Sequence, residues 1–155
     1  MKISTLEKII GSGFYSGYIP LASGTFGSIA ALFVYFIPGF EKLYVIIPAI
    51  VFFAIWGIAI GNKFESEYGK DPAECTIDEI VGMWITLLFL PKDIFVALTA
   101  FVVWRTMDII KPFPARKLES LNGGLGIMID DIISAIYALI FVHLILLIFG
   151  KHLIN

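Results

Sequence analysis

The 155-residue sequence contains a single cysteine and few charged residues. Cys75 has no second cysteine for an internal disulfide and no partner for a zinc site. Charged residues make up 15% of the chain and the net charge is -2, which excludes a nucleic-acid partner held by a basic surface. Repeats, low-complexity segments and Ser- or Pro-rich linkers are missing too, so we expect one domain over residues 1–155. We expect no cleavable signal peptide, because Lys2, Glu7 and Lys8 interrupt the first ten residues.

Hydrophobic residues, in contrast, make up 59% of the chain, and the mean hydropathy is +0.92. The apolar runs cover residues 26–37, 43–61, 80–90, 94–104 and 132–150. The second and the fifth are long enough for a helix across a hydrocarbon core of about 30 Å. We therefore predict an all-α, compact membrane protein with short helical hairpins and about four to five membrane-embedded helices. The three shorter runs would enter the bilayer partway or be covered by protein.

Residues 80–104 allow two interpretations, a single crossing helix or a hairpin of two short helices. A single helix would place Pro91, Lys92 and Asp93 in mid-bilayer, where a helix break and two charges are costly. We therefore favour a hairpin that turns at these residues, and a second hairpin over 26–61 that turns at "PGFEK". Both return the chain to its starting side. The N-terminal segment, 62–79 and 105–131 then share one face, with the C-terminus opposite.

The distribution of basic residues gives this topology an orientation. The face with the two longer connections carries Lys2, Lys8, Lys63, Lys70, Arg105, Lys111, Arg116 and Lys117. The opposite face carries Lys42, Lys92 and Lys151. Short loops rich in Lys and Arg stay in the cytoplasm, so we predict that the face with the longer connections is cytoplasmic.

Carboxylates cluster beside the apolar runs in "CTIDEIVG", "WRTMDIIKPFP" and "GGLGIMIDDIISA". The five acids are Asp78, Glu79, Asp108, Asp130 and Asp131. Ionised groups at a bilayer boundary usually bind a cation, pair with a base or take part in chemistry. Oxygen ligands suit Mg²⁺, and the neighbouring Arg105 and Lys111 suit a phosphate. An ordinary ladder of ion pairs at a helix end is the alternative for Arg105, Asp108 and Lys111.

Two glycine-rich segments accompany these acids. Gly123, Gly124 and Gly126 would let a ligand approach the backbone, or form a plain loop before a helix that Asp130 and Asp131 open. The N-terminal segment "GSGFYSGYIPLASGTFGSIAAL" precedes another apolar run and contains Thr25 and Ser28. Free N–H groups at that helix start could bind a phosphate, with Thr25 and Ser28 as substrate-binding residues. Helix packing through small residues explains the same pattern equally well.

Taken together, "DPAECTIDEIVGMW", "WRTMDIIKPFP" and "GGLGIMIDD" resemble the three ordered motifs of the phosphatidylglycerophosphatase A family. The likeness covers roughly residues 11 to 140, with Ser23 and Ser134 as departures. It implies a helical bacterial membrane enzyme, Mg²⁺ dependence, and phosphatidylglycerophosphate, a lipid phosphate monoester, as substrate. It also implies a catalytic role for the five acids. Four of these are the expected metal ligands: Asp78, Glu79, Asp130 and Asp131.

The residue types leave the nucleophile open between a metal-activated water and a carboxylate that forms an aspartyl phosphate. Two other functions compete with the phosphatase. A CDP-alcohol phosphatidyltransferase has a similar set of aspartates, but its Asp-Gly is missing before Ala115-Arg116 and position 134 is Ser rather than Asp. A small ion-coupled carrier would use the acids as a cation site, yet these acids lie near helix ends rather than on broken helices in mid-membrane.

Overall fold

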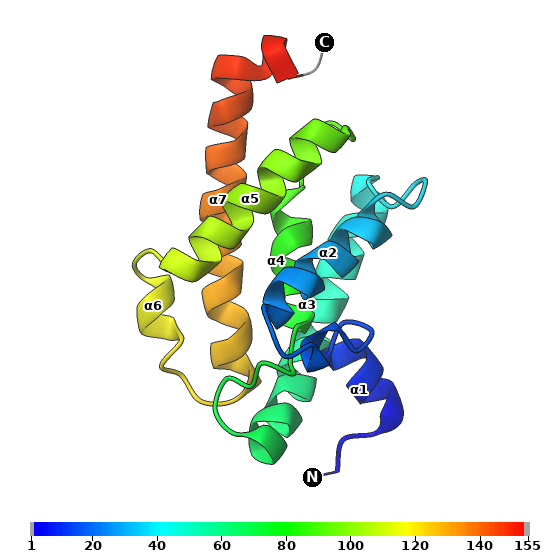
Figure 1. Ribbon diagram of the computed structural model, residues 1–155, viewed down its shortest axis with the longest axis vertical. Coiled ribbons are helices and arrows are strands. Elements are labelled where there is room, and N and C mark those ends of the chain that lie inside the picture. The colour runs from blue at the N-terminus through cyan, green and yellow to red at the C-terminus, as the bar shows by residue number, and fades with distance from the viewer. Residues whose placement is uncertain (1, 154–155) are drawn as a thin grey trace.

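Two helical hairpins and a long C-terminal helix make up the computed structural model, which describes residues 2–153 (Figure 1). Over that range every regular element is a helix, as predicted. The elements are α1 (Thr5–Gly11), a short 3-10 helix (Ser16–Tyr18), α2 (Ser23–Tyr35), α3 (Leu43–Tyr68), α4 (Ile77–Thr86), α5 (Ile94–Ile110), α6 (Ala115–Leu118) and α7 (Gly124–Leu153).

The first hairpin joins α2 to α3 and the second joins α4 to α5, so the hairpin prediction for residues 80–104 is confirmed. Asp93 caps α5, because its carboxylate accepts hydrogen bonds from the backbone N–H groups of Phe95 (2.8 Å) and Val96 (3.1 Å). Lys92 links the two turns through an ion pair with Glu41 at 2.7 Å. Both turns lie at the upper end of the molecule, and the connections from α3 to α4 and from α5 to α7 lie at the lower end (Figure 1).

Removing the Asp93 cap should weaken the second hairpin. Asp93→Ala should lower the free energy of unfolding by about 1 kcal/mol, because two N–H groups at the start of α5 lose their acceptor. Asp93→Asn keeps an oxygen acceptor and is the matched control. Thermal unfolding in detergent would measure both variants, and an equal loss in the two would contradict the capping role.

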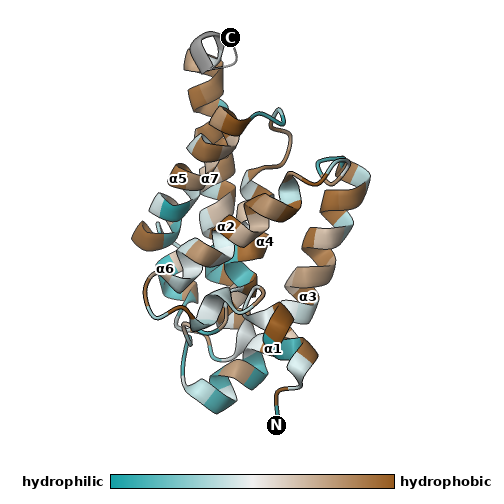
Figure 2. Ribbon diagram, turned by 45° about the vertical axis from the view of Figure 1, so that its right-hand side comes forward, coloured by the Kyte–Doolittle hydropathy of each residue, from teal (hydrophilic) through white to brown (hydrophobic). Residues whose placement is uncertain are grey.

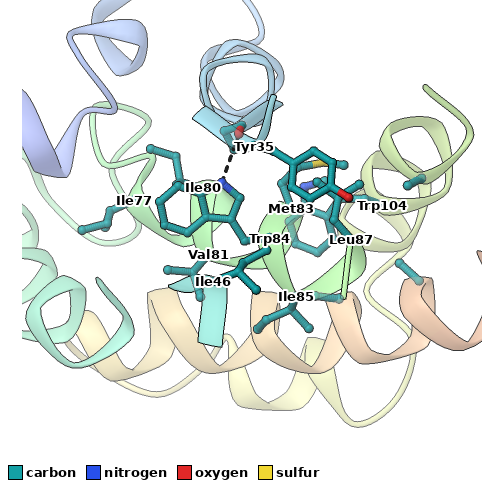
Figure 3. Close-up of a cluster of buried hydrophobic side chains, with 14 of the residues drawn as sticks. Tyr35, Ile46, Ile77, Ile80, Val81, Met83, Trp84, Ile85, Leu87 and Trp104 are labelled. Atoms are coloured by element: carbon teal, nitrogen blue, oxygen red, sulfur yellow. Dashed lines mark hydrogen bonds between the residues drawn. The ribbon is translucent and has the colours of Figure 1, made fainter. Parts of the chain in front are cut away.

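Helix α4 lies at the centre, in contact with α2, α3, α5 and α7. All of its side chains except that of Glu79 are buried. Figure 3 shows the indole of Trp84 directed from α4 toward α2, where its N–H donates to the Ala31 carbonyl at 3.0 Å. The ring of Trp104 comes from α5 and packs against α4 at Gly82, where a methyl group would lie 2.3 Å from the ring. The core therefore holds α4 in a fixed position relative to the helices around it.

Two helices in the described range, α3 and α7, are long and apolar enough to cross a membrane. This is fewer than the four to five membrane-embedded helices expected. Only 17% and 22% of their apolar spans are buried, which is unlike the core helix of a soluble protein. Figure 2 shows hydrophobic residues along most of α3 and the upper part of α7, with hydrophilic residues gathered at the turns and connections.

The start of the last helix differs from the prediction. Helix α7 begins at Gly124, not near residue 132, so Asp130 and Asp131 lie in its second turn and do not open it. The glycines before them pack tightly against other backbone. A methyl group at Gly124 would lie 2.0 Å from the Ile58 carbonyl of α3. Asn62 of α3 accepts the Gly124 N–H at 2.8 Å, which ties the start of α7 to α3. These glycines therefore serve helix packing.

Candidate active site

Two helices bring three acidic side chains together at the lower half of the molecule. Helix α4 supplies Asp78 and Glu79 in its first turn, and α7 supplies Asp131. One carboxylate oxygen from each of the three lies within 4.8 Å of the others. Asp78 and Asp131 are only 6% and 3% exposed, so their charges are shielded from water. Like charges this close and this buried repel each other strongly unless a cation lies between them.

The hydrogen bonding of these carboxylates fits a metal ion. Buried oxygens of Asp78, Glu79 and Asp131 have no hydrogen-bond partner in the described structure. Buried polar atoms are normally paired, and an unpaired ionised oxygen is especially costly. Three converging carboxylate oxygens are the ligand type that Mg²⁺ prefers. The residues present therefore fit the predicted ion, and they fit it through three of the four expected ligands.

The fourth expected ligand, Asp130, lies outside this three-residue cluster, although its Oδ1 is also buried without a hydrogen-bond partner in the described structure. Successive residues on a helix lie about 100° apart around its axis, so adjacent aspartates face different neighbours. Asp130 accepts a hydrogen bond from Lys111 at 2.5 Å, and Lys111 also forms an ion pair with Glu119 at 3.3 Å. Burial alone would lower the pKa of Lys111, but the bond to Asp130 and nearby acidic charges raise it above its ordinary value. Lys111 therefore stays protonated and links α5 to α7.

The fifth motif acid, Asp108, orients Arg105. The two residues are one turn apart on α5 and their charged groups lie 2.9 Å apart. The Nε atom of Arg105 is buried without a hydrogen-bond partner in the described structure. Arg105 and Glu79 together line a pocket of about 610 Å³. The guanidinium thus lines the pocket while its ion pair with Asp108 holds it in place.

The first turn of α2 forms another wall of this pocket. Ala22, Ser23 and Gly24 line it, together with Tyr18 and Pro20 before the helix and Ala73 and Glu74 before α4. No side chain caps α2, so its first N–H groups remain free for an anion. A methyl group at Gly24 would lie 2.3 Å from Glu79 Oε1 and 3.0 Å from Arg105 Nη2. Only glycine lets the helix start approach both side chains.

The two hydroxyl residues predicted to bind substrate lie in different settings. Thr25 is half-buried in the first turn of α2. Ser28 is fully buried one turn further, and its hydroxyl donates to the Gly24 carbonyl and accepts from the Trp104 indole, both at 3.0 Å. Sequence reasoning missed Glu74 and Tyr18 in the pocket wall. The small-residue pattern of the N-terminal segment indicated the region but not these side chains.

The chain is similar to known bacterial proteins over most of its length. Residues 9–146 match the family described as Phosphatidylglycerophosphatase A. A Haemophilus influenzae phosphatidylglycerophosphatase A is 39% identical over 150 residues, covering 91% of this chain and 90% of that protein. The Escherichia coli strain K12 phosphatidylglycerophosphatase A is 32% identical over 139 residues, covering 88% and 81%. A Bacteroides thetaiotaomicron protein, provisionally named a phosphatidylinositol-3-phosphatase, is 37% identical over 147 residues, covering 90% and 92%. No solved structure matches the chain.

Proposed function

The chain belongs to the phosphatidylglycerophosphatase A family and is a phosphoric monoester hydrolase, and we propose that its substrate is phosphatidylglycerophosphate. The products would be phosphatidylglycerol and inorganic phosphate. The observation that carries this proposal is the pocket in which Arg105 and the start of α2 face Glu79, which is also a member of the carboxylate cluster. Neither the carrier nor the phosphatidyltransferase alternative gains support from the relatives.

We further propose Mg²⁺ as the cofactor, held by Asp78, Glu79 and Asp131. The unpaired oxygens of these three buried carboxylates support it. When bound, the ion would neutralise charge on the phosphate and lower the pKa of a water molecule. Asp130 would not bind the ion. Its ion pair with Lys111 would hold the end of α5 next to α7 and so keep Asp131 in position.

The chain's own residues would bind and orient the phosphate. Arg105 offers a planar fork of donors to two phosphate oxygens, and Asp108 holds that fork in one orientation. The N–H groups at the start of α2 would bind another oxygen. Water attacks phosphorus, the bond from phosphorus to the glycerol oxygen breaks, and that oxygen takes up a proton. Binding the phosphate before attack contributes through proximity and orientation.

A phosphate-release assay on purified protein in mixed micelles tests this function. Phosphatidylglycerophosphate should be hydrolysed in Mg²⁺, and EDTA should stop the reaction until Mg²⁺ is restored. Phosphatidylinositol 3-phosphate is the comparison lipid, because one relative carries that name. Faster hydrolysis of the phosphoinositide would show that it, and not phosphatidylglycerophosphate, is the preferred substrate. Full activity in EDTA would contradict the metal proposal.

We also propose that α2 and α5 lie in the bilayer beside α3 and α7, in the bacterial cytoplasmic membrane with the active site on the cytoplasmic side. Exposed apolar side chains on both shorter helices support this, among them Phe33 of α2 and Phe95 and Val102 of α5. The bias of basic residues toward the active-site end supports the orientation. Helix α4 would remain enclosed by the other four.

Cysteine labelling in intact cells tests that orientation. In a background with Cys75 replaced, single cysteines at Lys70 and Lys117 should both resist an impermeant thiol reagent. A cysteine at the exposed Lys42, in the turn between α2 and α3, is the control and should be labelled. Labelling of the cysteines at positions 70 and 117, but not of the cysteine at position 42, would show that the topology is the opposite of the proposed one.

A further inference from the structure

A chain of buried hydrogen bonds connects α5 to the first turn of α2. The indole N–H of Trp104 donates to the Ser28 hydroxyl, and that hydroxyl donates to the Gly24 carbonyl, each at 3.0 Å. Trp104 and Ser28 are both fully buried. A single hydroxyl of α2 thus accepts from a donor on α5 and ties that contact to the first turn of its own helix. Losing it would leave the Trp104 N–H unpaired in the core.

The two ends of this chain lie next to pocket residues. Trp104 directly precedes Arg105 on α5. Its ring packs closely against α4 because Gly82 has no side chain, and an added methyl group there would clash with the ring. Gly24 lies at the other end, in tight approach to Glu79 and Arg105. A small displacement of the first turn of α2 would therefore change its spacing to Arg105.

We propose that Ser28 and Trp104 are a positioning pair, which fixes the start of α2 at the distance from Arg105 that binds a phosphate oxygen between them. The inference rests on the proposed function, because it explains how that phosphate pocket keeps its shape. Ala22 provides no side-chain cap for α2. The Ser28 hydroxyl instead provides a polar link from the core to this helix start. Ser28 acts through the helix and does not touch the substrate.

Ser28→Ala tests the pair. The variant should lose about 10- to 100-fold in kcat/KM, the range typical of supporting hydrogen bonds around an active site. Thr86→Val is the matched control, because Thr86 is also fully buried and its hydroxyl also donates to a carbonyl one turn earlier, that of Gly82, at 2.9 Å. The control should melt at a temperature similar to that of Ser28→Ala but keep the wild-type rate. Equal rate losses in both variants would overturn the proposal.

A double-mutant cycle and hydrogen exchange provide independent readouts. Trp104→Phe removes the N–H donor, and the Ser28→Ala/Trp104→Phe double variant should be no slower than the slower single variant. Additive losses would show that the residues act separately. Amide exchange over residues 22–30 should accelerate in Ser28→Ala and not in Thr86→Val. If the wild type hydrolysed no lipid phosphate, the proposed function would fail, while the exchange comparison would still decide the positioning pair.

Discussion

Replacing Asp131 with asparagine should slow phosphate release about a thousandfold. Asp131 is one of three carboxylates whose oxygens converge within 4.8 Å, and the amide brings no negative charge to a cation held there. A bound metal stabilises the transition state by several kcal/mol, and each 1.4 kcal/mol is worth about a factor of ten in rate. Steady-state kinetics over a range of Mg²⁺ concentrations would measure the loss. An Asp131→Asn variant within about tenfold of the wild-type rate would contradict the proposed metal site.

The melting temperature of Asp131→Asn, measured without substrate, provides a second test of the metal site. Mg²⁺ should raise the melting temperature of the wild type and not that of Asp131→Asn, because a ligand stabilises only the form that binds it. In EDTA the variant should melt no lower than the wild type, since it removes one of several buried charges that repel each other. Asp71→Asn is the matched control, because Asp71 is an exposed acid outside the cluster. It should keep both the activity and the response to Mg²⁺.

The hairpins were predictable because their signals are local. Pro91, Lys92 and Asp93 break an apolar run, and a proline beside two charges can hardly lie inside a membrane helix. The same reasoning placed the three acid motifs at one end of the molecule, where α4 and α7 bring Asp78, Glu79 and Asp131 together and α5 places Asp108 beside Asp131. Once both hairpins return, any acids beside their open ends must share a face.

The errors arose where a tertiary contact decides the outcome. Gly124 and Gly126 look like loop residues, yet they are helical. Packing against neighbouring backbone explains why they are glycines, because a larger side chain would not fit there. Spacing along α5 allowed an ion pair between Asp108 and Lys111 as the alternative to phosphate binding. Lys111 instead ends the helix in a left-handed conformation (φ 47°), which turns it toward Asp130 on α7. Neither the backbone reversal nor the partner from a distant helix could be read from spacing.

Arg105→Lys should lower kcat/KM about 100-fold while leaving the protein folded. Lysine keeps the positive charge beside Asp108, so the buried carboxylate retains a partner. It cannot reproduce the planar fork that would bind two phosphate oxygens. Loss of one preorganised donor to a transition state typically costs about 100- to 1000-fold in rate. Kinetics and thermal unfolding of the same preparation would separate the lost rate from lost stability.

Comparison with Arg105→Ala decides between a phosphate-binding and a purely structural arginine. The alanine variant leaves Asp108 buried without its ion pair, so it should lose both activity and several degrees of melting temperature. Arg116→Lys is the control for the substitution itself, because Arg116 is exposed on α6 and should tolerate lysine in both measurements. If Arg105→Lys were as active as the wild type while Arg105→Ala unfolded, Arg105 would serve only to neutralise Asp108. A stable Arg105→Lys variant with impaired turnover would instead show that the guanidinium binds the phosphate. In that case the positive charge alone would maintain stability, while catalysis would require the planar pair of donors that lysine lacks.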